Sequence, residues 1–122
     1  MKIPDNLKYT DHDEWVKLDG DVMSVGITDY AQDQLGELVH VELPAVGKKV
    51  QAGAVVCEVE SVKAVAEIYA PATGEVVAVN EILEDAAEQI NKDPYGSWIY
   101  KLKVAAPPAG LLDPAAYRTK VS

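Results

Sequence analysis

The stretch from residue 55 to residue 69 is typical of strand throughout, but its alternation of polar and apolar side chains changes phase once. Strands usually run about 3 to 10 residues, so a chain reversal is expected inside it. Up to Glu60 the polar positions are even-numbered, and the other face carries Val55, Cys57 and Val59. Beyond Lys63 the polar position is Glu67, and the other face carries Ala64, Ala66, Ile68 and Ala70. Because the phase can change only at a turn or a bulge, the pattern predicts a hairpin tip between Glu60 and Ala64, with Lys63 in it.

Shorter alternating stretches on both sides predict further strands. They cover residues 15–18, 21–25, 38–43, 75–79 and 98–104. Between the first two, Asp19-Gly20 supplies the positive φ angles of a tight hairpin turn. Gly53 and Pro71 mark turns on the two sides of the lysine hairpin. Many short strands with few helical residues indicate a mostly β protein, either a small β-sandwich or a barrel.

Two short helices are expected, near residues 28–35 and 113–119. Thr28 is a suitable N-cap for the first helix, and Gly36 offers the left-handed position that often follows a last helical turn. Asp113 is a suitable N-cap for the second helix, and Pro114 after it suits a first helical position. The helical content is therefore expected to be small.

Lys63 is the candidate functional residue. The predicted tip contains none of the Gly, Asn, Asp or Pro residues that hairpin turns normally use, so its residues are interpreted as selected for another role. An exposed lysine on a projecting turn has an accessible amine on a flexible stem, and lysine is a common target of acylation. The pattern alone leaves open the alternative that Lys63 is an ordinary solvated surface lysine.

The sequence around Lys63 is Glu60-Ser61-Val62-Lys63-Ala64, followed by Glu67-Ile68-Tyr69-Ala70-Pro71. It closely resembles the lipoyl-attachment segment of the glycine cleavage system H protein family, and further blocks of the chain match that family in its order. The other matching blocks are Val25 to Gln32, Leu35-Gly36-Glu37, Val41 to Pro44 with Gly47, and Asn91 to Gly96 through Trp98. The resemblance extends roughly from Asn6 to Tyr117, which is nearly the whole chain.

The resemblance implies a fold and a function. It implies one H-protein domain over residues 1–122, with a lipoyl-domain-like barrel-sandwich hybrid at residues 22–104 as the lipoyl-binding core. It also implies that Lys63 is the N6-lipoyllysine attachment site and that covalently bound lipoic acid is the cofactor. Such a protein is a carrier and not an enzyme, and it shuttles the aminomethyl group of decarboxylated glycine between enzymes.

The resemblance implies four partner enzymes. Glycine decarboxylase (P protein) loads the carrier and releases CO2, and aminomethyltransferase (T protein) passes the carbon to tetrahydrofolate with loss of ammonia. Dihydrolipoyl dehydrogenase (L protein) reoxidises the dithiol. A lipoylating enzyme must recognise the hairpin before any of these steps.

Three further residues are candidates for the site. Glu60 and Ser61 are expected to help the lipoylating enzyme recognise its target, although Glu60 could simply solvate the strand edge. Glu14 matches a family carboxylate that we expect near the cationic amine of the loaded arm; the alternative is a solvated glutamate at a strand end. The family commonly has His-Glu-Trp where this chain has Asp13-Glu14-Trp15. Because His12 is displaced by one residue, a histidine role at that position stays open.

Composition and charge exclude several classes of partner. A chain of 122 residues with 48% hydrophobic residues can bury the core of one ordinary domain. A formal net charge of −9 without a basic cluster argues against nucleic-acid and anionic-lipid binding. No apolar run approaches the ~20 residues that cross a bilayer, and no signal segment is evident. We therefore expect a monomer in the bacterial cytoplasm.

Catalytic and metal chemistry find little support in the sequence. His12, His40 and Cys57 match no nucleophilic triad and no usual zinc spacing, and Cys57 is expected to be a buried structural thiol. Biotin-carrier domains typically flank their lysine with methionines, whereas Lys63 lies between Val62 and Ala64. Two alternatives to the glycine-cleavage carrier stay open: a carrier that relays lipoate to other acceptors, and an unmodified interaction module.

Overall fold

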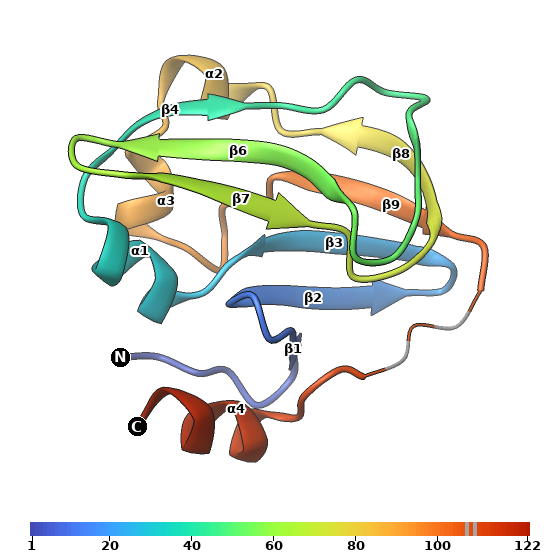
Figure 1. Cartoon of the computed structure of the whole chain (residues 1–122), viewed down its shortest axis with the longest axis horizontal. Coiled ribbons are helices and arrows are strands. Elements are labelled where there is room, and N and C mark those ends of the chain that lie inside the picture. Colours follow the sequence, from blue (N-terminus) through green and yellow to red (C-terminus); the bar gives the residue numbers. More distant parts are fainter. Residues whose placement is uncertain (107, 109) are drawn as a thin grey trace.

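The computed structural model describes residues 1–106, 108 and 110–122, and it shows two antiparallel sheets packed against each other (Figure 1). In spatial order the larger sheet contains β1 (Lys8–Tyr9), β2 (Glu14–Asp19), β3 (Val22–Ile27), β9 (Tyr100–Val104), β8 (Gly74–Val79) and β5 (Lys49–Val50). The smaller sheet contains β4 (Leu38–Glu42), β6 (Val55–Ser61) and β7 (Val65–Tyr69). The predicted mostly β fold is confirmed as an open sandwich whose sheets do not close into a barrel.

The main core fills the space between the sheets. The larger sheet contributes Met23, Val25 and Leu102, and the smaller sheet contributes Val41 and Val59; each of these side chains is 1% exposed or less. Full burial of such a side chain stabilises the fold by about 1.5–3 kcal/mol. The lysine hairpin is therefore attached to the molecule through the buried face of β6.

A second, smaller cluster covers the opposite face of the larger sheet. Its buried members are Leu7, Tyr9, Trp15 and Tyr117. Tyr117 belongs to α4 (Pro114–Val121), and its ring stacks on Tyr9 at a centroid distance of 4.6 Å. Trp15 lies directly over Gly26, where an added Cβ would come within 2.6 Å of the indole. The C-terminal helix is thus fastened to the first strands of the sheet.

Both predicted helices are confirmed with their caps. In α1 (Asp29–Leu35) the Thr28 hydroxyl accepts from the Ala31 N–H, and Gly36 follows the last turn at φ 81°. In α4 the Asp113 carboxylate accepts from the Ala116 N–H at 2.8 Å. The remaining helices are the single turns α2 (Ile82–Asp85) and α3 (Gln89–Lys92). No helix among the described residues is long and apolar enough to span a membrane.

Two local predictions were wrong in detail. The β2–β3 turn consists of Gly20 and Asp21, and only Gly20 has positive φ, at 64°; Asp19 belongs to the strand. Val55 does not share a buried face with Cys57 and Val59, because the pairing of β6 with β7 shifts between residues 55 and 57. That bulge buries Val56 and leaves Val55 39% exposed.

Candidate functional site

Lys63 lies at the tip of the hairpin that joins β6 and β7. β6 ends at Ser61 and β7 begins at Val65, which confirms the predicted reversal. The tip projects from one end of the sandwich, beside α1 (Figure 1). Lys63 is exposed, and the ion pair found among the described residues joins Lys120 to Asp13 and does not involve it. Its amine is therefore free to react.

Ser61 forms the turn on which Lys63 sits. Its hydroxyl accepts from the N–H groups of Lys63 (3.2 Å) and Ala64 (3.0 Å), and its own N–H donates to the Ala64 carbonyl (2.8 Å). No residue of the tip needs positive φ, because the serine hydroxyl replaces the usual turn residue. The interpretation that no tip residue was selected for turning was therefore wrong for Ser61, which is 4% exposed.

The segment after α1 supports the tip from one side. The Val62 N–H donates to the Glu37 carbonyl at 3.1 Å, and the Lys63 stem passes so close to Gly36 that a Cβ there would lie 3.4 Å from Cε. Asn91 fixes this segment: its amide donates to the Gly36 carbonyl at 2.8 Å and accepts from the Leu38 N–H at 2.9 Å. Asn91 belongs to a block that the resemblance had marked, but only the structure shows its role.

The exposed face of the smaller sheet is acidic. Glu60 is exposed and pairs with His40 on one side and Val65 on the other. In the neighbouring row, Glu58 pairs with Glu42 and with Glu67. Like charges directly opposite one another destabilise a sheet. The face next to Lys63 is thus electrostatically costly.

Glu14 is fully buried, at 0% exposed, and is not the solvated strand-end residue of the alternative interpretation. One carboxylate oxygen accepts from the Thr10 hydroxyl at 2.9 Å, and the other accepts from the Tyr69 N–H at 2.6 Å. Burial raises the pKa of this carboxyl to about 7, against the opposing effect of these two hydrogen bonds. Glu14 therefore joins β2 of the larger sheet to β7 of the smaller one.

The structure does not place Glu14 beside Lys63. Its partner Tyr69 is the last residue of β7, whereas Lys63 precedes the first. At about 3.3 Å per strand residue, the two ends are roughly 20 Å apart along the chain. His12, which the sequence left without a role, lies at the same far end and stacks on the Tyr69 ring at a centroid distance of 4.0 Å.

Comparison with known proteins identifies the family. A sequence model of the family described as Glycine cleavage H-protein matches residues 7–121. The chain is 60% identical over 104 residues to a probable glycine cleavage system H protein of Pyrococcus horikoshii, covering 84% of this chain and 77% of the relative. It is 53% identical over 118 residues to the glycine cleavage system H protein of Burkholderia vietnamiensis, covering 94% of each. The chain belongs to the glycine cleavage H-protein family.

The fold agrees with an H protein of known structure. The crystal structure of a glycine cleavage system H protein from Mycobacterium marinum superposes with a TM-score of 0.91 at 40% identity, over 97% of this chain and 98% of that one. Members of the H-protein family are carriers rather than catalysts, so the chain is not an enzyme, as predicted. The buried Cys57 thiol also fits no nucleophilic role, because burial raises its pKa to about 12.

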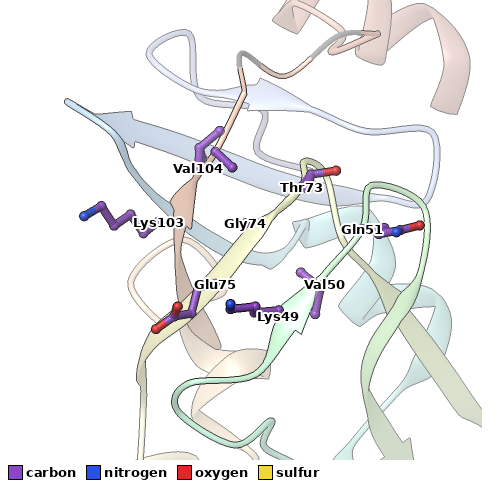
Figure 2. A pocket seen from close by; sticks show the side chains of 9 residues that line it. Lys49, Val50, Gln51, Thr73, Gly74, Glu75, Lys103 and Val104 are labelled. Atoms are coloured by element: carbon purple, nitrogen blue, oxygen red, sulfur yellow. The ribbon is translucent and has the colours of Figure 1, made fainter.

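A groove of about 640 Å³ lies elsewhere on this H-protein fold. It is lined by Lys49 to Gln51, Thr73 to Glu75 and Lys103 to Ala105 (Figure 2). These residues precede β6 and follow β7, so the groove lies at the end of the hairpin away from the tip. Its size alone would make it a candidate site, but Lys63 does not line it.

Proposed function

We propose that Lys63 carries lipoic acid and that the protein shuttles the aminomethyl group of decarboxylated glycine from glycine decarboxylase to aminomethyltransferase. The observation that carries the proposal is an exposed lysine that forms no ion pair within the described part of the chain and lies at a hydrogen-bonded hairpin tip in a chain of the H-protein family. The residues present fit the group, because amide formation needs an accessible amine and leaves the buried face of β6 untouched. Lipoic acid bound to Lys63 would supply a disulfide that opens to accept the aminomethyl group, and it would become a dithiol for dihydrolipoyl dehydrogenase only after aminomethyltransferase has removed that group.

The chain itself contributes a fixed attachment point. Tethering keeps the reacting group within a short reach of each partner enzyme, which raises its effective concentration there. The acidic face beside the tip favours encounters with partners that present basic surfaces, an effect that salt weakens. The carrier thus acts by presentation and not by catalysis.

We further propose that Ser61 and Glu60 serve recognition by the lipoylating enzyme. Ser61 gives the tip its shape through its hydrogen bonds to Lys63 and Ala64. Glu60 is exposed and lies three residues before Lys63, so a protein that approaches the lysine can contact it. An enzyme that modifies Lys63 therefore meets both a defined turn and a negative charge.

For Glu14 we propose a role in the cleft that receives the loaded arm. A carboxylate attracts a cationic amine strongly where water is excluded, and Glu14 is buried at the edge of β7. Since both its oxygens are engaged, an arriving amine has to join or displace the Thr10 hydroxyl and the Tyr69 N–H.

We propose that residues 1–122 form one H-protein domain with a lipoyl-binding core at residues 22–104. One hydrophobic cluster that includes residues of both sheets supports a single domain. We propose a monomer that works in the cytoplasm, where a single free cysteine such as Cys57 stays reduced.

Two measurements test the function. Intact-mass measurement of protein from its native host should show a lipoyl adduct on Lys63, and its absence would favour an unmodified interaction module. Lys63→Arg, which keeps the charge, should abolish glycine-dependent CO2 exchange with glycine decarboxylase while the circular dichroism spectrum stays that of the native fold. Lipoylated protein that supports no exchange would instead favour a lipoate relay, and exchange retained by the variant would overturn the assignment of Lys63.

A further inference from the structure

Asp13 has an unusual backbone conformation between two residues that contact Tyr69. It is the only residue other than glycine among those described with a positive φ, at 63°. Side chains with a Cβ rarely adopt this left-handed conformation, although Asp and Asn do so several-fold more often than others. On one side of Asp13, His12 stacks on the Tyr69 ring; on the other, Glu14 accepts from the Tyr69 N–H.

Tyr69 lies on an unpaired strand edge. β7 is the last strand of the sheet ordered β4-β6-β7, so N–H groups on its outer side lack a neighbouring strand. The Glu14 carboxylate supplies the missing acceptor at 2.6 Å. The direction of the chain at Asp13 decides whether His12 and Glu14 reach that edge.

The C-terminal helix holds Asp13 in place. The Tyr117 hydroxyl donates to Asp13 Oδ1 at 3.1 Å, and the Lys120 ammonium lies 3.3 Å from the same oxygen. The backbone is held as well, because the Asp13 carbonyl accepts from the Thr28 N–H at 3.0 Å. Contacts from α4 and from the start of α1 therefore converge on one residue.

These contacts form a directed chain of hydrogen bonds. An ionised carboxylate only accepts, so Tyr117 must donate to Asp13. The hydroxyls of Thr28 and Tyr117 lie 2.6 Å apart, and Thr28 must then be the donor between them. This leaves a Thr28 lone pair for the Ala31 N–H at the N-terminus of α1. Thr28 and Tyr117 are both 0% exposed, and the loss of one link leaves a buried polar group unpaired, which is costly.

We propose that Asp13 is a positioning residue, and that Tyr117 of the C-terminal helix holds it so that Glu14 and His12 meet Tyr69 at the free edge of β7. The importance of this arrangement for the loaded arm rests on the proposed function. The arrangement itself does not, and it is present before any modification of Lys63.

The test uses unlipoylated full-length protein and four variants. Asp13→Ala removes both the acceptor and the tolerance of positive φ, whereas Asp13→Asn keeps both. Tyr117→Phe removes the hydroxyl but keeps the ring that stacks on Tyr9. Lys120→Gln removes the partly exposed ion pair with Asp13 but keeps the buried Tyr117 hydroxyl; because such exposed pairs contribute little, it is the matched control.

Two local readouts are measured by NMR. The first is hydrogen exchange of the Tyr69 amide, compared with the Ile99 amide, which donates to the Val25 carbonyl inside the core region. The second is the pKa of the Glu14 carboxyl. Asp13→Ala and Tyr117→Phe should speed Tyr69 exchange about tenfold more than Ile99 exchange. Removing the Asp13 charge lowers the pKa of Glu14 directly, so this pKa is compared only in Tyr117→Phe, where it should fall as the carboxyl becomes less buried. Asp13→Asn and Lys120→Gln should stay within about twofold of the parent protein.

The result that overturns the proposal is equally specific. If Asp13→Ala and Tyr117→Phe change Tyr69 and Ile99 exchange equally, and Tyr117→Phe leaves the Glu14 pKa unmoved, the two residues only stabilise the fold. Because no step needs lipoate, this outcome says nothing against Lys63 as the attachment site. Conversely, an unmodified Lys63 would leave the positioning result intact.

Discussion

The exposed faces of the two sheets differ in how charged residues are paired across neighbouring strands. On the larger sheet, three exposed residues pair across neighbouring strands with alternating charge: Lys49, Glu75 and Lys103. On the smaller sheet, the corresponding row consists of three glutamates: Glu42, Glu58 and Glu67. Cross-strand pairs of opposite charge stabilise a sheet by about 0.2–1 kcal/mol, and like charges destabilise it.

The two faces therefore differ in what they contribute: one stabilises the fold, and the other lies next to the exposed Lys63. The larger sheet carries the charge pattern expected of a surface that has only to be stable and soluble. The smaller sheet carries Lys63 and tolerates repulsion on its exposed face. Stability lost on that face is supplied by its buried face, where Val41 and Val59 are at most 1% exposed.

The largest effect should come from Gly74→Ala in the larger sheet. A Cβ at this position would lie 2.2 Å from the Lys103 carbonyl oxygen, which is backbone and cannot move aside. The change should lower the free energy of unfolding by about 3 kcal/mol, measured by urea denaturation. Gly53→Ala is the matched control, because Gly53 has φ 87° and no atom within 4 Å of an added Cβ; it should cost about 1 kcal/mol. Equal costs for the two variants would contradict this explanation.

An effect of up to similar size, but confined to a range of pH, should appear where the two sheets meet at Glu14. Since burial raises the pKa of its carboxyl from 4.5 to about 7, the folded protein holds a proton that the unfolded chain releases. This contribution to stability is complete below pH 4.5 and is lost as the pH rises through about 7, amounting to roughly 3 kcal/mol at most.

Glu14→Gln is the variant that isolates this contribution. Its amide oxygen can still accept from the Tyr69 N–H, but the side chain no longer ionises. The difference in unfolding free energy between parent and variant should therefore change in the variant's favour between pH 4.5 and 8. Parallel curves over that interval would show that Glu14 does not titrate as described.

The smallest effect should have opposite signs on the two sheets. Glu58→Gln interrupts the row of glutamates and should raise the free energy of unfolding by about 0.5 kcal/mol. Glu75→Gln removes the charge between Lys49 and Lys103 and should lower it by a similar amount. Both differences should shrink at 1 M salt. Changes of the same sign in the two variants would refute the contrast between the faces.

Local pattern was sufficient to predict much of the fold. The hairpin tip at Lys63 followed from the phase of alternation, and α1 and α4 followed from Thr28, Gly36 and Asp113, because each signal lies within a few residues of the feature it determines. The two-residue strands β1 and β5 were not predicted, since so short a stretch carries no period.

The features that the sequence did not reveal depend on distant partners. Glu14 looks like a solvated residue at a strand end until Tyr69 presents an unpaired N–H to it. The role of Ser61 was not evident from the sequence, because a serine whose hydroxyl forms a turn looks the same there as any other serine. The positive φ of Asp13 depends on Tyr117, more than a hundred residues later.

The link between the Val62 N–H and the Glu37 carbonyl has a consequence for binding kinetics. Ordering one backbone residue costs about 1–2 kcal/mol of conformational entropy, and at the tip this cost is met when the chain folds. An enzyme that engages the hairpin therefore does not have to freeze a disordered loop. Association with such an enzyme can then be limited by collision frequency and surface charge rather than by ordering of the loop.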